Sequence, residues 1–124
     1  MEKNWYSISN IQDAASGAVL AEACAGAGSL WFSGHFPDDP TLPGIAILSM
    51  VMDILRHSEA EKGRKIKIVG VRRVRFKLPV RPNELLNISL SSYQREGGLS
   101  YNFVVELNGK TVCMGSVVAE LSPK

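Results

Sequence analysis

The sequence predicts an α+β fold in which an antiparallel sheet wraps around one long central helix. Two patterns indicate it. Residues 45–55 are apolar on nearly every side and follow a Pro43-Gly44 pair, which is typical of a helix start. From Lys65 onward, apolar residues instead recur at every second position, with turn residues between the segments. One buried helix followed by an antiparallel meander is an α+β arrangement.

Each element has its own sequence signal. The helix is expected over residues 43–59, and Lys62-Gly63-Arg64 closes it. Strands are expected, in chain order, over residues 19–25, 65–69, 74–78, 85–93, 101–107 and 111–121.

Turn residues separate these strands. Gly70 marks a bulge or a bend within one long strand. Turns are expected at Ser16-Gly17, at Glu96-Gly97-Gly98 and at Asn108-Gly109, of which the last is the strongest hairpin signal in the chain. Residues 5–15 are mixed in character and predict no element.

Length and composition describe one small domain. The 124 residues are 45% hydrophobic, which is enough for a single core, so one domain over residues 1–124 is expected. The net charge of +2 is too mild to indicate a nucleic-acid partner. The longest apolar run, residues 45–52, is interrupted by Ser49 and is too short to cross a bilayer. No signal peptide is evident, so a soluble, cytoplasmic protein without a membrane partner is expected.

The two cysteines, Cys24 and Cys113, both lie in strand-like segments and lack the spacing of a metal motif. We therefore expect two buried, reduced thiols, and neither a metal nor a cofactor.

A histidine lies in a proline-stiffened loop just before the helix. His35 precedes a helix start whose backbone amides are unpaired, so a proton acceptor stands beside an anion-stabilising site. Residues 35–44 read His-Phe-Pro-x-x-Pro-x-x-Pro-Gly. This resembles the signature of the hotdog-fold (3R)-hydroxyacyl-acyl-carrier-protein dehydratases of bacterial fatty-acid synthesis. Residues 74–85 resemble a second segment of that family, with Asn83 in place of its glycine.

The resemblance implies a reaction and two roles. In the family, a 3-hydroxyacyl thioester loses its α-proton and its β-hydroxyl to give a trans-2-enoyl thioester. His35 would be the base, since an imidazole has a pKa near the operating pH. The amide of Gly44 would donate to the thioester oxygen as negative charge develops there.

Ser49 departs from the family pattern. The resemblance places a glutamate or aspartate at this position, where it assists departure of the hydroxyl, and a serine hydroxyl is not a carboxylic acid. Asp53 is the possible substitute, because it lies four positions on and hence on the same helix face. Two interpretations stay open for Asp53: the missing acid, or a carboxylate hydrogen-bonded to a loop or to an arginine of a partner subunit.

Two further sets of residues are predicted to serve binding. Apolar side chains near the site mainly pack, and some are expected to line an acyl tunnel: Trp31, Phe32, Leu48 and Met52. The densest positive segment has two interpretations, the solvated face of a strand or a docking surface for an acidic acyl carrier protein. The docking residues would be Arg73, Arg75, Lys77 and Arg81.

Three functions remain open. The first is a dehydratase or dehydratase-derived enzyme acting on an acyl thioester of acyl carrier protein. The second is a hotdog thioesterase, in which Asp53 activates water. The third is a non-catalytic binder of acyl chains or carrier protein, for which Ser49 is the main argument. The resemblance also implies a homodimer, or a higher oligomer of dimers, because the family builds each site between two subunits.

Overall fold

The computed structural model describes residues 2–3, 5–32, 39–95 and 98–122. One long helix, α1 (Gly44–Glu61), lies against an antiparallel sheet. Within the described residues this sheet has seven strands, in the order β1-β2-β3-β5-β6-β7-β4. In chain order these strands are β1 (Glu2–Lys3), β2 (Tyr6–Asp13), β3 (Val19–Cys24), β4 (Ile66–Phe76), β5 (Leu86–Arg95), β6 (Gly98–Leu107) and β7 (Lys110–Leu121).

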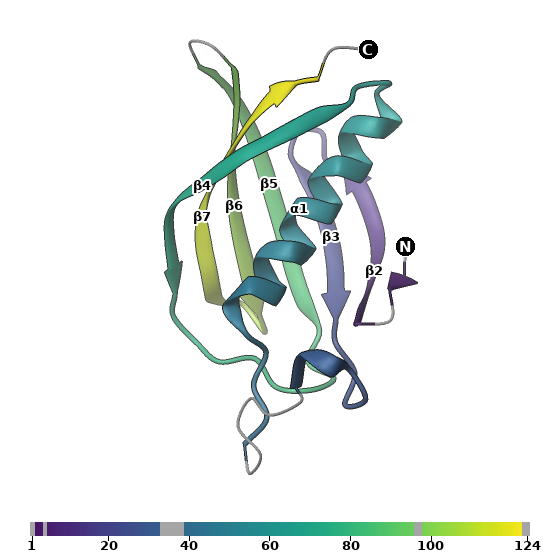
Figure 1. The fold of residues 1–124 in the computed structure, drawn as a ribbon, viewed down its shortest axis with the longest axis vertical. Helices are drawn as coiled ribbons and strands as arrows, with labels where there is room; N and C mark the ends of the chain where they lie inside the picture. Colours follow the sequence, from purple (N-terminus) through teal and green to yellow (C-terminus); the bar gives the residue numbers. More distant parts are fainter. Residues whose placement is uncertain (1, 4, 33–38, 96–97, 123–124) are drawn as a thin grey trace.

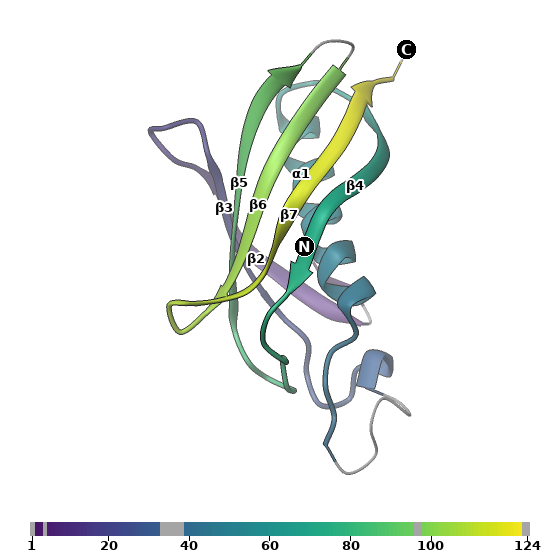
Figure 2. The same cartoon turned by 90° about the vertical axis from the view of Figure 1, so that its left-hand side faces the viewer.

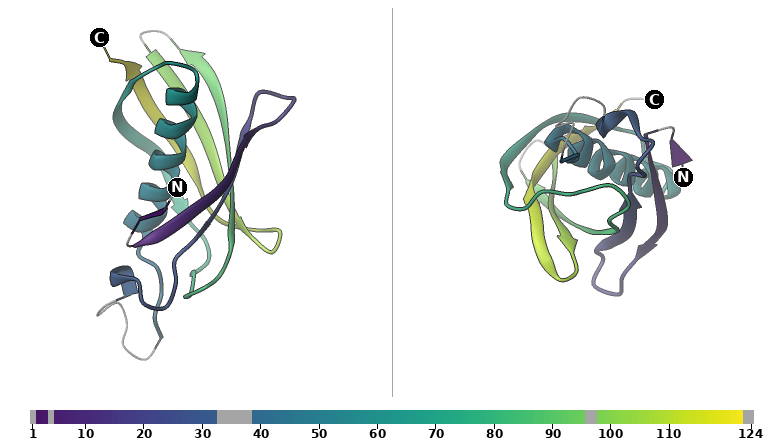
Figure 3. Two further views of the ribbon diagram at one scale, coloured as in Figure 1. Left: turned by 90° about the vertical axis from the view of Figure 1, so that its right-hand side faces the viewer. Right: turned by 90° about the horizontal axis from the view of Figure 1, so that it is seen from below.

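The sheet curves around α1 and buries most of the helix surface. Figure 2 shows β5, β6 and β7 side by side, and Figure 3 shows the curvature of the sheet from the end of the molecule. The core forms between the inner sheet face and the helix residues Met50, Val51 and Ile54, each 0% exposed. The α+β arrangement predicted from the sequence is therefore confirmed.

The helix begins one residue later and ends two residues later than predicted. Pro43 is the N-cap rather than the first helical residue, and it offers no side-chain cap. The closing segment behaves as predicted, because Gly63 takes a positive φ of 75° and the Arg64 amide donates to the Glu59 carbonyl at 2.9 Å.

Several turns follow their sequence signals. Asn108 and Gly109 both have positive φ, 52° and 81°, as a tight hairpin turn requires. The pairing of β4 with β7 shifts register between Ile68 and Gly70, so the predicted irregularity lies inside one strand. The turn predicted at residues 96–98 lies mostly outside the described residues, although Arg95 pairs with Gly98 across it.

Two expectations need correction. Residues 5–15 carry a strand, β2, which pairs with β3. Its signal was the short alternation in which Tyr6 and Ile8 are buried between exposed serines.

The second correction concerns the cysteines. Cys113 is buried as expected, but Cys24 is only half-buried; both are free thiols. Burial raises the pKa of the Cys113 thiol to about 11.

A buried carboxylate closes the far end of the helix. Glu59 is 2% exposed, and its Oε2 lies 2.7 Å from Nε of Arg64 in an ion pair, with Nζ of Lys62 at 3.8 Å from Oε1. A buried charge is tolerated only with such partners.

We expect Arg64→Ala to lower the free energy of unfolding by about 1–2 kcal/mol, because it removes the close cation from a buried carboxylate. Lys62→Ala is the matched control. Its longer contact is expected to contribute less than about 1 kcal/mol. Urea unfolding of both variants measures the difference, and equal losses would contradict this account.

Candidate functional site

The beginning of α1 lies at the end of the molecule that also carries the 3-10 helix η1 (Leu30–Phe32) and the segment after β4 (Figures 1 and 2). Two backbone hydrogen bonds hold this end together. The Leu42 amide donates to the Val80 carbonyl at 2.7 Å, and the Asn83 amide donates to the Ala25 carbonyl at 2.8 Å. The helix start is therefore fixed against the segment that follows β4.

Asn83 stands where the motif that residues 74–85 resemble has a glycine, at a position with an unusual backbone conformation. Its φ is 68°, in the left-handed region that glycine adopts freely and that asparagine tolerates better than most residues. The departure from the motif is thus conservative for the backbone. It leaves the turn after β4 in place.

A groove opens beside Gly44. Its volume is about 400 Å³, and its walls include the apolar side chains of Ile47, Phe76 and Leu78 together with Lys77. The Phe76 ring lies directly on Gly44, since a Cβ added there would be 2.6 Å from the ring Cζ. Glycine at this position lets the ring lie in place, because any side chain here would force the ring to move.

The amides at the helix start are available as donors. The Ala46 amide donates to the Pro43 carbonyl at 2.9 Å, in the first turn of the helix. Within the described part of the chain, the Gly44 amide donates to no acceptor that would compete with a ligand. A helix N-terminus of this kind favours an oxygen carrying negative charge.

The structure joins Ser49 and Asp53 through a tyrosine from β2. The Tyr6 hydroxyl lies 2.8 Å from Oγ of Ser49 and donates a short hydrogen bond to Oδ2 of Asp53. Asp53 is 9% exposed, and its Oδ1 lies 3.7 Å from Nη1 of Arg56. The two helix residues therefore share one face, as their spacing predicted, and belong to one hydrogen-bonded cluster.

Tyr6 remains protonated throughout the physiological range. Burial, followed by its bond to Asp53, raises the pKa of the Tyr6 phenol to about 12, against a smaller lowering by the Ser49 bond. Sequence reasoning missed this residue, because the β2 pattern is short and its tyrosine resembles any core aromatic.

A second buried tyrosine provides a comparison. Tyr101 is 3% exposed, and its hydroxyl has no hydrogen-bond partner within the described residues. Burial and the nearby Glu59 charge raise the pKa of Tyr101 to about 12.

Stability is expected to fall between pH 10 and pH 12. The folded protein keeps both phenols protonated in a range where the unfolded chain ionises them, so the stabilisation is complete below pH 10 and disappears as pH approaches 12. Removing Tyr101 by Tyr101→Phe should reduce this decline by roughly 1–3 kcal/mol. It should not destabilise the protein at pH 7, since its hydroxyl is unpartnered within the described residues. Urea unfolding at pH 9 and pH 11 tests this, and an undiminished decline in the variant would contradict it.

The other predicted residues are placed as follows. His35 lies outside the described residues, so its role as the base stays a prediction. Trp31 is half-buried with its ring edge-on to Trp5 at 4.7 Å between centroids, and Phe32 is buried. Leu48 and Met52 are half-buried on α1. These four residues are absent from the groove lining, and their part in a tunnel stays a prediction.

The positive segment is exposed, but its members differ. Arg73, Arg75 and Lys77 are exposed on or just after β4. Arg81 instead forms an ion pair with Asp39, Nε to Oδ1 at 3.0 Å. Among the residues that the structure describes, three of the four predicted docking residues thus form no ion pair.

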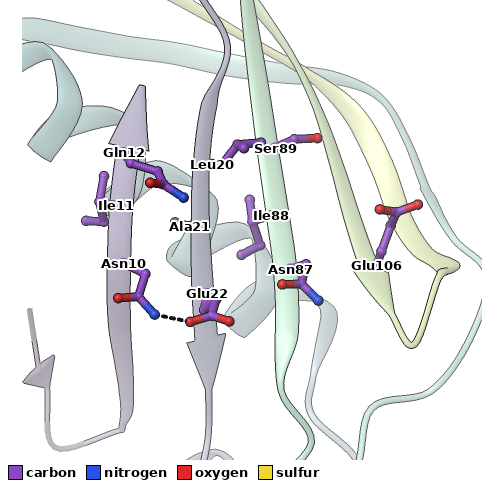
Figure 4. A pocket seen from close by; sticks show the side chains of 10 residues that line it. All are labelled: Asn10, Ile11, Gln12, Leu20, Ala21, Glu22, Asn87, Ile88, Ser89 and Glu106. Carbon is purple, nitrogen blue, oxygen red and sulfur yellow. Dashed lines mark hydrogen bonds between the residues drawn. The ribbon is translucent and has the colours of Figure 1, made fainter. Parts of the chain in front are cut away.

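A larger hollow, of about 540 Å³, lies elsewhere on the sheet. Figure 4 shows its lining side chains on β2, β3, β5 and β6. Polar groups predominate, and Asn10 donates a hydrogen bond to Glu22 across β2 and β3. Leu20 and Asn87 are exposed there while their neighbours Ala21 and Ile88 belong to the core, so this hollow is on the outer sheet face.

The described residues contain no group of three or more metal-ligating side chains. None of the described helices combines the length and the apolar character needed to span a membrane.

Comparison with solved structures defines the class. The fold matches the dehydratase heterocomplex ApeI:P of Xenorhabdus doucetiae, with a TM-score of 0.73 at 21% identity over 91% of this chain and 96% of that chain. It also matches a hypothetical thioesterase with coenzyme A from Streptococcus pneumoniae, with a TM-score of 0.72 at 13% identity over 96% and 90% of the two chains. The chain therefore has the hotdog fold.

Sequence comparison narrows the class. The model of the ApeI-like family, described as ApeI dehydratase, matches residues 11–116, so the chain belongs to the ApeI-like dehydratase family. It is also 25% identical to the 3-hydroxyacyl-acyl-carrier-protein dehydratase FabZ of Clostridium perfringens over 90% of this chain and 84% of that protein. The FabZ of Haemophilus influenzae strain 86-028NP is 34% identical over 66% of this chain and 60% of that protein. These comparisons place the chain among hotdog proteins related to acyl-thioester chemistry.

Proposed function

We propose that this protein is a dehydratase that removes water from a 3-hydroxyacyl thioester carried by acyl carrier protein. One observation carries the proposal: α1 retains a buried carboxyl group, Asp53, that is tied through Tyr6 to the position where the family has its acid. The substitution by Ser49 therefore does not remove acid chemistry from this helix face.

The groove beside Gly44 supports the same reaction. Its apolar walls suit an acyl chain, and its helix start offers a donor for the thioester oxygen as enolate charge develops. His35, nine positions before Gly44 in the sequence, is assigned as the base that takes the α-proton. No cofactor takes part in these steps.

The decisive experiment follows the mass of a 3-hydroxyacyl carrier protein incubated with the purified protein. Loss of one water is the expected result. Release of the free hydroxy acid would instead identify a thioesterase, in which the carboxylate of Asp53 activates water. A bound but unchanged acyl carrier protein would identify a non-catalytic binder. Either of these outcomes overturns the dehydratase assignment.

A homodimer is proposed on the exposed edge of β4. This strand is the last of the sheet and pairs only with β7 among the described strands. It presents Val69 at 59% and Val71 at 38% exposure, and Ile45 at the helix start is 59% exposed. An unpaired apolar edge favours pairing with a second chain. Analytical ultracentrifugation is expected to show a dimer. A monomer would contradict the homodimer proposal and would favour pairing of this chain with a different subunit, as in the Xenorhabdus heterocomplex.

Carrier-protein docking is assigned to the positive residues of β4 and the segment after it. Lys77 lines the groove itself, and Arg73 and Arg75 are exposed nearby in sequence. An acidic carrier protein would be steered toward such a rim. We expect added salt to raise KM for the carrier-protein substrate several-fold while leaving KM for the same acyl group on pantetheine unchanged, in steady-state assays. Equal salt effects on both substrates would exclude this dock.

A further inference from the structure

Three oxygen atoms form a continuous chain in this protein. Ser49 Oγ, the Tyr6 hydroxyl and Asp53 Oδ2 are joined by two hydrogen bonds, the first of 2.8 Å and the second shorter. Ser49 and Asp53 come from successive turns of α1, about 6 Å apart along its axis, and Tyr6 bridges them from β2. The hydrogen-bonded groups therefore follow one another in the order Ser49 hydroxyl, Tyr6 hydroxyl and Asp53 carboxyl group.

The two ends of this chain differ in access. Ser49 is half-buried, whereas Tyr6 and Asp53 are 5% and 9% exposed. Arg56 Nη1 faces the other oxygen, Oδ1, so Oδ2 is the oxygen directed at Tyr6. Ser49 is therefore the more exposed end of the three-residue cluster.

We propose that Ser49, Tyr6 and Asp53 form a proton relay, in which the serine hydroxyl hands to the departing group a proton that originates on Asp53. The inference rests on the proposed dehydration and specifies how a serine serves at the position of the family's acid. Ser49 is then the catalytic residue that contacts the substrate, and Tyr6 transfers the proton from Asp53 to Ser49.

The proton balance is complete. In the structure the Tyr6 O–H donates to the Asp53 carboxylate. The relay requires Asp53 to take up a proton first and the two hydroxyls to rotate. The Asp53 O–H then donates to Tyr6, the Tyr6 O–H donates to Ser49, and the Ser49 O–H donates to the β-hydroxyl. When the carbon–oxygen bond breaks, each proton moves one link, water leaves, and Asp53 becomes the carboxylate. The α-proton is meanwhile taken by His35, and its transfer back to Asp53 through solvent restores the starting state. No oxidant or further reactant is consumed.

Neither hydroxyl needs to ionise for this transfer. Burial raises the pKa of the Tyr6 phenol to about 12, so Tyr6 is protonated throughout the working pH range. The Ser49 hydroxyl and the phenol each lose and gain a proton in the same step. Arg56, whose side chain is 54% exposed, lies 3.7 Å from Asp53 Oδ1 and stabilises the carboxylate formed at the end of the transfer.

The test uses three single variants, Ser49→Ala, Tyr6→Phe and Asp53→Asn, each with the 3-hydroxyacyl carrier-protein substrate. Each is expected to lower kcat by about 10²-fold with little change in KM, because each breaks the same proton path. The double variant Tyr6→Phe/Asp53→Asn should be no slower than either single variant, since the residues act as one unit. Tyr101→Phe is the matched control for loss of a buried phenol, and it should retain the wild-type kcat.

A second set of variants distinguishes a role of Tyr6 in proton transfer from a role in packing. In a Ser49→Glu background, the introduced acid protonates the leaving hydroxyl directly, so adding Tyr6→Phe should cost less than about threefold in kcat. Thermal unfolding of every variant confirms that it is folded under assay conditions.

The outcomes are distinguishable. A wild-type protein that releases no water overturns the proposed function and the relay together. An active wild type whose Ser49→Ala variant keeps full kcat, while Asp53→Asn loses it, overturns the relay alone and makes Asp53 a direct acid. A Tyr6→Phe loss that persists unchanged in the Ser49→Glu background also overturns the relay, because it assigns Tyr6 to structure.

Discussion

Replacing His35 by asparagine is expected to lower dehydration by roughly 10²- to 10⁴-fold, the range that positioned general-base catalysis supplies. Asparagine preserves size and hydrogen bonding but does not take up a proton near neutral pH. The rate of enoyl product formation under saturating substrate measures the effect. Because the substrate should still bind the groove, KM is expected to change far less than kcat.

The chain contains its own control for this substitution. His57 is the only other histidine of the sequence, and its Nε2 lies 3.4 Å from Oε1 of Glu61 near the end of α1. His57→Asn removes a similar side chain from the opposite end of the helix and should leave kcat unchanged. If the two variants lose activity equally, the base is not His35.

Replacing Gly44 by alanine is expected to damage both the fold and the site. The added Cβ would stand 2.6 Å and 2.8 Å from two carbons of the Phe76 ring, closer than packed atoms approach. Alanine gains up to about 1 kcal/mol in helix propensity, but overpacking costs about 1–3 kcal/mol. Phe76 is 52% exposed and can swing outward, so the ring is expected to move into the groove mouth rather than unfold the helix.

Such a movement would misplace the substrate. A displacement of about 1 Å at a reacting centre costs on the order of 10²-fold in rate, and a loss of that size is expected for Gly44→Ala. Phe76→Leu in the same chain should restore stability by making room for the methyl group. Gly28→Ala is the control, since a Cβ there meets nothing within 4 Å. A Gly44→Ala variant as stable and active as the Gly28→Ala variant would show that the contact with Phe76 is unimportant.

The sequence predicted the elements that have strong local signals. The apolar run before and after Met50 predicted the helix, and Asn108-Gly109 predicted its hairpin, because each signal lies within a few neighbouring residues. The strand β2 was missed because its alternation covers only residues 6–9 before a register shift between Ser9 and Gln12 interrupts it.

The site was predictable only in part, for a similar reason. Spacing along one helix placed Ser49 and Asp53 on a common face, which the structure shows. Tyr6 is separated in sequence from Ser49 by 43 positions and from Asp53 by 47 positions, so no local pattern contains these contacts. Likewise, the need for glycine at position 44 arises from the ring of Phe76, which the chain brings in from β4.

The pairing of β4 has a consequence for biosynthesis. Its only described sheet neighbour is β7, which the ribosome makes after β5 and β6 have already been completed. During translation, α1 and β4 would therefore emerge with their apolar surfaces uncovered, and closing so long a loop is slow compared with forming a hairpin. Nascent chains halted before Lys110 should accordingly engage chaperones until the seventh strand arrives to complete the sheet.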